Sequence, residues 1–384
     1  MKILIAPDSF KGSMTADTVC RITSKAVRDT FPLADVRTLP LADGGEGTCN
    51  ALMSALHAEG IPCEVQGPLG DSVTAGYGIL ETSGVKAAIM DMASASGLTL
   101  VPEAKRDVFH SSTFGTGEMM LDAIQRGCRH IYLGLGGSAT SDGGMGMAAA
   151  LGVRFLDKFG KILAPVPVSM EKIDSIDLSN LDSRIAETQI TIMSDVKNPL
   201  LGPTGAVYVY GPQKGILESQ LRTMDSAMEH YIDIAEKATR KKIRTVPGAG
   251  AAGGLGAGLL AFTSCEIQSG IETVLALLKF DELLADTDIV ITGEGRMDAQ
   301  SAFGKVIAGV AAHCKSQNIP CLALAGSLGA GAEDMYELGV TGIMPLVDRI
   351  TSLDEAILHS EENCYRAAVR MLRILGSGFR QPSE

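Results

Sequence analysis

The order of short apolar runs, polar loops and helical segments constrains the fold of this chain more than any other feature. Residues 3–6 form an apolar run, and after a polar loop Val19, Ile22 and Ala26 recur at the spacing of one helix face. Residues 36–39 are predicted to form a second strand, again followed by a polar loop and a helical segment. This repeated order is typical of a parallel sheet covered by helices, so we predict an α/β fold.

The same order returns near the C-terminus, after a central part of different character. Apolar runs predict further strands at residues 289–291, 321–325 and 342–346. In the central part, residues 76–80 and 85–90 flank a Ser-Gly turn, which predicts an antiparallel hairpin. We therefore expect a discontinuous parallel-sheet α/β domain made of residues 1–65 and 285–384. A mixed α/β domain of residues 66–284 would be inserted into it.

Composition and charge exclude several classes of protein. The 384 residues are 46% hydrophobic, which supports sizeable buried cores and excludes a disordered chain. The formal net charge is -12 and the longest basic run is residues 240–242, so we expect no nucleic-acid partner. No apolar run reaches the roughly 18 residues of a membrane span, so we expect no membrane partner. The 8 cysteines form no CxxC pair, which is typical of a reducing compartment and predicts a cytoplasmic protein.

Polar residues at the predicted strand ends are the first candidates for chemistry, because ligands of open parallel sheets bind outside the carboxyl ends of the strands. The first such loop carries Asp8, Ser9 and Lys11. A helix cap beside a solvated lysine is the alternative interpretation. The second loop carries Asp43 and Glu46 around a pair of glycines, where two carboxylates are suited to a metal ion or a substrate hydroxyl. A glycine-rich turn with acidic residues at a helix N-terminus is the alternative.

The third loop, residues 134–146, is the richest in glycine. It contains Gly136, Gly137, Ser138 and Asp142, directly after the predicted strand 131–135. Backbone amides in such a loop can form an anion-binding nest for a phosphate or a carboxylate. Close packing of a helix on the sheet would call for the same glycines.

Two further strand ends carry carboxylates. Asp195 follows a buried strand and is a candidate base or metal ligand, although a structural cap would need the same residue. Glu294, Arg296 and Asp298 leave another strand end together. The arginine could hold a substrate carboxylate by two hydrogen bonds, and a local ion pair is the alternative.

One motif points away from these loops. Residues 248–253 match the dinucleotide pattern G-x-G-x-x-G, but no clear buried strand precedes them. We therefore expect a glycine- and alanine-rich helix start packed closely on another element, and no nicotinamide or flavin. A Walker A motif is absent, so any ATP site is not a P-loop. Acidic glycine-rich loops, a few lysines and an anion nest together favour phosphoryl transfer, where catalysis is mainly positioning and charge neutralisation.

In combination the loops resemble the bacterial glycerate kinase family, of the type that phosphorylates the 2-hydroxyl. The matching segments follow one another in order over nearly the whole chain, at residues 5–13, 40–48, 115–118, 134–146, 195–200, 211–215, 247–262 and 291–298. Each segment alone is weak, and the ordered set is specific. Ser141 departs from the pattern, because the family usually has Asn before the Asp-Gly-Gly sequence.

The resemblance implies a flavodoxin-like domain with an inserted restriction-enzyme-like domain. It also implies ATP and Mg²⁺, with (R)-glycerate as the acceptor. Asp195 would take the hydroxyl proton, with Asp8, Lys11 and Lys214 as further catalytic candidates, the lysines neutralising phosphate oxygens. Asp43 and Glu46 would hold Mg²⁺. The residues expected to bind substrate or phosphate are Ser9, Gly136, Gly137, Ser138, Asp142, Glu294 and Arg296.

Other readings stay open at this point. The acceptor hydroxyl could be the 3-hydroxyl, or the acceptor could be another small hydroxy acid. A nucleotide or metabolite sensor without turnover is the alternative from a different class, although such a sensor needs no base like Asp195. The expected partners are small molecules alone, and a homo-oligomer is neither required nor excluded.

Overall fold

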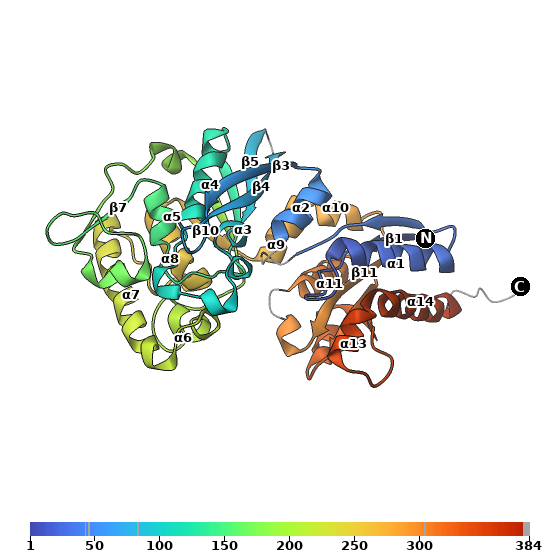
Figure 1. Ribbon diagram of the computed structural model, residues 1–384. Helices are drawn as coiled ribbons and strands as arrows, with labels where there is room; N and C mark the ends of the chain where they lie inside the picture. The colour runs from blue at the N-terminus through green and yellow to red at the C-terminus, as the bar shows by residue number, and fades with distance from the viewer. Residues whose placement is uncertain (43, 45–46, 83, 303–304, 379–384) are drawn as a thin grey trace, which may run out of the picture. The chain divides into compact units, whose positions relative to one another are not determined.

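The computed structural model describes residues 1–42, 44, 47–82, 84–302 and 305–378 (Figure 1). The chain forms two compact units. The first unit comprises Met1–Asp43, Ser54–Leu56 and Gly270–Glu384, and the second comprises Gly44–Met53 and His57–Ser269. The polypeptide thus leaves the first unit and returns to it.

The first unit is built on a five-stranded sheet in the order β13-β12-β11-β1-β2. All neighbouring strands are parallel. This is the flavodoxin-like strand order, which confirms the expected fold class. The strands are β1 (Lys2–Ile5), β2 (Asp35–Thr38), β11 (Ile289–Met297), β12 (Cys321–Leu328) and β13 (Val340–Pro345). The helices are α1 (Ala16–Thr30), α9 (Gly270–Leu277), α10 (Phe280–Leu284), α11 (Val306–Ser316), α12 (Met335–Leu338), α13 (Leu353–Leu358) and α14 (Ser360–Gly378).

Helices cover both faces of this sheet. Helix α1 begins after Thr15, whose side chain caps it by accepting a hydrogen bond from the Thr18 amide. Its buried face carries the predicted apolar residues, and α1 lies beside α14 (Figure 1). Ile3 and Ile5 of β1 pack into the same core as Leu372 of α14. Helix α11 contacts β11 and β12.

The second unit contains a six-stranded mixed sheet in the order β10-β9-β6-β5-β4-β3. Its strands are β3 (Glu59–Gln66), β4 (Ser72–Thr82), β5 (Val85–Asp91), β6 (His130–Gly134), β9 (Gln189–Met193) and β10 (Cys265–Gln268). The pairs β3–β4 and β4–β5 are antiparallel, which confirms the predicted hairpin, and β5, β6, β9 and β10 run parallel. A short antiparallel pair joins β7 (Arg154–Leu156) and β8 (Ser175–Asp177). The helices are α2 (Thr48–Leu56), whose last three residues belong to the first unit, α3 (Ala93–Ser96), α4 (Phe114–Gln125), α5 (Met145–Ala150), α6 (Ala206–Tyr210), α7 (Glu218–Thr239) and α8 (Ala251–Phe262).

The unit boundaries differ in detail from those that the sequence suggests. Strand β3 pairs with β4 along its whole length and therefore belongs to the second sheet, although it lies within the expected segment 1–65. Helices α9 and α10 precede the expected boundary at residue 285 and belong to the first unit, where α9 packs on α11. Among the helices that the structure describes, none combines the length and the apolar character needed to cross a bilayer.

Candidate active site

The parallel strands of the second unit bring three candidate groups to one edge of the sheet. In the register of these strands, Asp91 of β5 is level with Gly134 of β6, which is level with Met193 of β9. Neighbouring strands lie about 4.8 Å apart. Asp91, the loop that follows Gly134, and Asp195 two residues beyond β9 therefore leave adjacent strands at the same edge. This carboxyl edge is the expected location of a ligand site.

The loop after β6 presents backbone amides. The amide of Leu98 donates to the Gly137 carbonyl at 2.8 Å, and the amide of Ala139 donates to the Ser96 carbonyl at 2.9 Å, which fixes the loop on both sides. Gly137 has φ +73°, a conformation that favours glycine. Within the described part of the chain, the amides of residues 136–138 donate no hydrogen bond. These amides, called the nest below, are available to an anion.

Lys214 lies beneath the nest with 2% of its surface exposed. It ends the 3₁₀ helix Pro212–Lys214, and its Nζ donates to Ser138 Oγ at 2.7 Å and to the Thr140 carbonyl at 2.6 Å. Burial lowers the pKa of Lys214 to about 7, while the nearby Asp142 carboxylate acts in the opposite direction. Lys214 therefore holds the loop in shape and, when protonated, adds positive charge behind the nest.

Asp142 organises the same loop from inside. It is fully buried, and its Oδ2 accepts hydrogen bonds from the amide and hydroxyl of Thr113 and from the amide of Gly146, at 2.7, 2.8 and 3.0 Å. Its Oδ1 accepts from the Gly144 amide at 3.0 Å. Burial raises the pKa of Asp142, and these hydrogen bonds counteract the rise. Because its oxygens are occupied within the loop, the geometry supports a positioning role for Asp142 and no direct contact with a ligand.

The glycine-rich segment 248–253 supports the nest from the other side. No strand precedes it, and α8 begins with Ala252, Gly253 and Gly254 in left-handed conformations. A Cβ on Gly253 would lie 2.0 Å from the Thr140 carbonyl oxygen, so only glycine allows this approach of two backbones. The Gly143 amide donates to the Gly253 carbonyl at 3.1 Å. The predicted close packing of a glycine- and alanine-rich helix start is thus present, and its partner is the nest loop.

Asp91 is a site-edge residue that sequence reasoning missed. It is buried, and its carboxylate accepts hydrogen bonds from the amides of Gly47 and Cys49, the latter as close as 3.1 Å, at the start of α2. Asp91 thereby anchors the glycine-rich loop that precedes α2. The two metal-ligand candidates of that loop, Asp43 and Glu46, lie outside the described residues. Among the residues that are described, no group of three or more His, Cys, Asp or Glu could hold a metal ion.

The carboxyl edge of the first unit holds Asp8, Ser9 and Lys11. The backbone of Asp8 continues the sheet, because its amide donates to the Gly293 carbonyl at 2.9 Å. The Asp8 side chain is buried and accepts a hydrogen bond from the Ser9 amide at 2.6 Å. The chain then turns at Phe10, which bridges to Met14, and this turn leaves the side chain of Lys11 exposed.

Glu294 and Arg296 at the end of β11 both have local partners. Glu294 is buried, accepts a hydrogen bond from the Ser301 hydroxyl and forms an ion pair with Lys305 at 3.5 Å. Burial raises the pKa of Glu294, and both partners oppose the rise. The Arg296 side chain is 71% exposed, with its Nε 3.1 Å from Asp298 Oδ2. Glu294 thus ties β11 to the residues before α11, whereas Arg296 keeps the freedom to turn toward a ligand.

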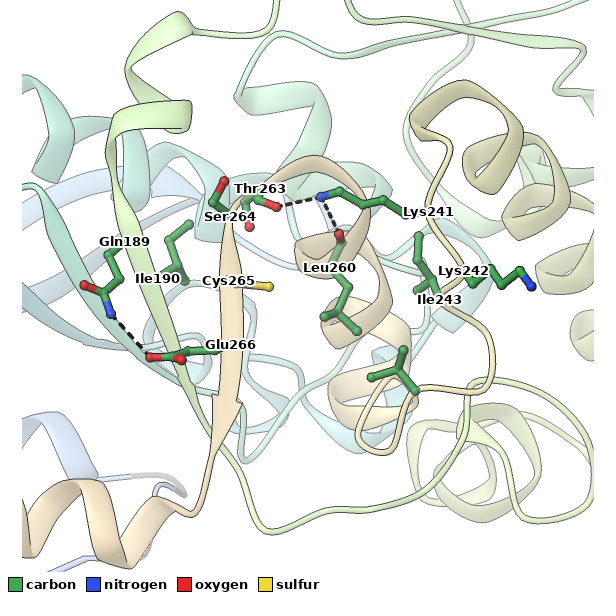
Figure 2. A pocket seen from close by; sticks show the side chains of 11 residues that line it. Gln189, Ile190, Lys241, Lys242, Ile243, Leu260, Thr263, Ser264, Cys265 and Glu266 are labelled. Carbon is green, nitrogen blue, oxygen red and sulfur yellow. Dashed lines mark hydrogen bonds between the residues drawn. The ribbon is translucent and has the colours of Figure 1, made fainter.

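A cavity elsewhere in the second unit does not belong to this site. It has a volume of about 620 Å³ and is lined by residues at the amino ends of β9 and β10, among them Gln189, Cys265 and Glu266 (Figure 2). Lys241 beside it donates to the carbonyls of Leu260 and Thr263 and so caps the end of α8. Because the cavity lies at the opposite end of the strands from Asp195, and none of the candidate residues lines it, we do not assign it to the active site.

Comparison with known proteins places the chain among its relatives. The model of the glycerate kinase family matches residues 3–376. The chain belongs to the glycerate kinase family. It is 46% identical to the glycerate kinase of Halalkalibacterium halodurans, over 95% of this chain and 96% of the relative. It is 42% identical to the glycerate 2-kinase of Escherichia coli, over 99% of both chains. The crystal structure of a protein described as glycerate kinase 2 from Salmonella typhimurium LT2 is similar as well, with a TM-score of 0.87, 40% identity, and coverage of 99% of this chain and 100% of that one.

In this member of the glycerate kinase family, the candidate residues thus form two groups. The nest, Lys214, Asp142 and Asp195 belong to the carboxyl edge of the second unit. Asp8, Ser9, Lys11, Glu294 and Arg296 belong to the carboxyl edge of the first. Both groups lie where a parallel sheet offers its ligand site.

Proposed function

We infer that this chain is a glycerate kinase, which transfers the terminal phosphoryl group of ATP to a hydroxyl of glycerate. The family match from residue 3 to residue 376 is the observation that carries this conclusion. A phosphoryl-transfer enzyme needs positioned donors for phosphate and carboxylate oxygens together with a base for the attacking hydroxyl. The groups at the two sheet edges supply donors and carboxylates of these kinds.

We propose that the second-unit edge binds the acceptor end of the reaction. The amides of residues 136–138, with Lys214 behind them, would receive an anionic group, either the glycerate carboxylate or the phosphoryl group in transfer. Asp195 leaves the strand next to the nest and would take the proton of the attacking hydroxyl. At the first-unit edge, Lys11 would neutralise phosphate oxygens, Arg296 would hold the glycerate carboxylate, and Asp8 and Ser9 would complete the loop around the phosphates.

Mg²⁺ belongs to the same proposal. A nucleotide-bound Mg²⁺ is commonly held by one or two carboxylates together with phosphate oxygens and water, so it needs no cage of three protein ligands. Asp43 and Glu46, which belong in sequence to the glycine-rich loop before α2, are the proposed ligands. When bound, the metal would neutralise the phosphate charge during transfer.

The proposed product is 2-phosphoglycerate, formed with ADP from (R)-glycerate. The test is ³¹P NMR of the product that purified protein forms from D-glycerate, ATP and Mg²⁺. A 2-phosphoglycerate signal is expected. A 3-phosphoglycerate signal would retain the kinase and overturn the proposed regiochemistry. Protein that binds ATP but forms no phosphorylated product from glycerate would reject the activity, and a panel of small hydroxy acids would then separate another acceptor from a sensor without turnover.

We also propose a cytoplasmic location. All 8 cysteines are free, and Cys20, Cys49, Cys128, Cys314, Cys321 and Cys364 are buried, as suits a reducing compartment. Burial raises the pKa of Cys49 and of Cys364 to about 12, so these thiols stay protonated and inert. For the oligomeric state, a homo-oligomer stays a proposal that light scattering of the purified protein would decide.

A further inference from the structure

A cavity in the first unit has no role in the proposal above. Its volume is about 310 Å³. It is bounded by the loop after β1, by Gly295 of β11, Gly326 of β12 and Leu346 after β13, and by residues of α13 and α14. We propose that this cavity receives the adenosine part of ATP. The proposal rests on the proposed kinase function and specifies where the nucleotide base is held.

The position of the cavity in the fold is the first argument. It opens at the carboxyl ends of β1, β11, β12 and β13. From β1 the chain continues to β2 on one side, whereas β11 flanks β1 on the other side, so the strand order reverses direction at this point. Ligands of open parallel sheets bind outside the carboxyl ends of the strands where the order reverses.

The apolar lining is the second argument, because it distinguishes the two substrates. Leu346 is buried in the cavity wall, whereas Leu353 and Ile357 of α13 are 75% and 38% exposed. A flat aromatic base would cover these exposed side chains and gain the free energy of burying apolar surface. Glycerate carries a carboxylate and two hydroxyls on three carbons and offers no comparable apolar face. The lining therefore selects the base of the nucleotide over the acceptor.

The polar groups in the wall are the third argument. Ser360 and Asn363 of α14 line the cavity, and each is only 8% exposed. Among the described residues, neither side chain has a hydrogen-bond partner, so the polar atoms of both are available to a ligand in the cavity. An Asn carboxamide offers a donor and an acceptor side by side, which matches the amino group and a ring nitrogen of adenine. The Asn363 amide is thus suited to recognise adenine specifically.

A cation at the same cavity, Lys11, is the fourth observation that supports a nucleotide there. Lys11, whose side chain is exposed, lines this cavity together with Ser13. A nucleotide whose base contacts Asn363 would extend its phosphates toward the loop after β1. This agrees with the proposed role of Lys11 at the phosphates, and it joins base recognition and phosphate neutralisation in one unit of the protein.

The experiment compares two cavity variants with two controls on the same helices. Ala356→Phe fills the cavity from α13, and Asn363→Leu removes the amide while keeping a similar volume. The controls are Leu358→Phe and Glu362→Leu, at residues of α13 and α14 that are exposed and do not line the cavity. Dissociation constants for ATP and for inorganic tripolyphosphate, which lacks the base, are measured by calorimetry, and KM for ATP and GTP by product formation.

We expect both cavity variants to weaken ATP binding and raise KM for ATP at least tenfold, with kcat at saturating ATP within twofold. Tripolyphosphate binding should stay unchanged, and Asn363→Leu should also lose any preference for ATP over GTP. Unchanged ATP affinity in both folded variants would overturn the proposal, as would wild-type protein that does not bind ATP. Failure of the kinase function has a different signature, because ATP binding would then still respond to the variants while glycerate stays unphosphorylated.

Discussion

The two sheet edges differ in the exposure of their cations. At the second-unit edge, Asp142 and Lys214 are buried and bonded to the loop itself, and backbone amides are left facing outward. At the first-unit edge, Lys11 and Arg296 are exposed on flexible side chains. Buried groups with fixed partners hold a geometry, whereas exposed charges are mobile and screened by salt. We therefore expect the second-unit edge to fix the geometry of transfer and the first-unit edge to supply adjustable charge.

The largest expected effect is the loss of kcat when Asp195, the proposed base, is replaced. Asp195→Asn keeps the size and polarity of the side chain and removes its ability to take a proton. If Asp195 is the base, kcat should fall by about 10²–10⁴-fold, with KM for ATP nearly unchanged. The control is Asp157→Asn, because Asp157 is a turn residue whose side chain accepts backbone hydrogen bonds that Asn can also accept. Wild-type turnover in Asp195→Asn would refute the assignment and move the search for a base to the first-unit edge.

The second prediction breaks the backbone packing that supports the nest. Gly253→Ala would place a Cβ 2.0 Å from the Thr140 carbonyl oxygen at φ +65°. Gly160→Ala is the matched control, because Gly160 has a similar φ of +76° and open space around its Cβ position. The control should cost about 1–2 kcal/mol from backbone strain alone. Gly253→Ala should cost at least about 1–3 kcal/mol more, because the backbones must move apart, and should lower kcat as the nest distorts.

Urea denaturation of both glycine variants, with activity assays beside it, measures this difference. Equal losses of stability would mean that the nest loop adjusts freely. In that case the second-unit edge would be as adaptable as the first, and the contrast between the two edges would not hold.

The third prediction concerns the pH dependence of stability that the buried Lys214 side chain causes. The pKa of Lys214 is about 7 in the folded protein and about 10.5 when the chain is unfolded. Between these values the unfolded chain binds a proton that the folded chain does not, so the stability of the folded state rises as pH increases from 7 to 10.5. The slope approaches about 1.4 kcal/mol per pH unit. Below pH 7 both states carry the proton, and the full cost of burying the charge applies.

Lys214→Met removes this contribution, so the stability of the variant should rise less steeply over the same pH window. Denaturation curves at several pH values between 7 and 10 measure the slope for wild type and variant. Parallel curves would show that Lys214 titrates near its ordinary value and is better solvated than its surroundings indicate.

The sequence predicted the architecture better than the chemistry of single residues. Strand periodicity and the order of loops indicated both sheets and most candidate loops, because these depend on local patterns. Strand β3 escaped notice, because Gly60 and Pro62 interrupt its pattern and its pairing with β4 is a tertiary feature. Asp91 was missed although it directly follows the predicted strand segment 85–90, just as Asp195 follows a predicted buried strand.

The roles of individual side chains depended on partners that are distant along the sequence. Lys214 acquires its role from Ser138 and Thr140, which lie more than 70 residues away. Spacing along the chain carries no signal for such a contact. The sequence could therefore place Lys214 in the family pattern, but it could not show that the lysine is buried beneath the nest and shapes it.

The smallest expected effect concerns Arg296, an exposed cation of the first-unit edge. Its ion pair with Asp298 is at the surface, so Arg296→Lys should change the free energy of unfolding by less than about 1 kcal/mol. Lysine keeps the charge but loses the planar pair of donors that binds a carboxylate at two points. If Arg296 holds the glycerate carboxylate, KM for glycerate should rise roughly tenfold while KM for ATP stays within twofold.

Steady-state kinetics with each substrate varied in turn measures these two KM values, with Arg154→Lys as a control at another surface ion pair. Equal rises in both KM values would reject the carboxylate contact, and Arg296 would then act only through its ion pair at the end of β11.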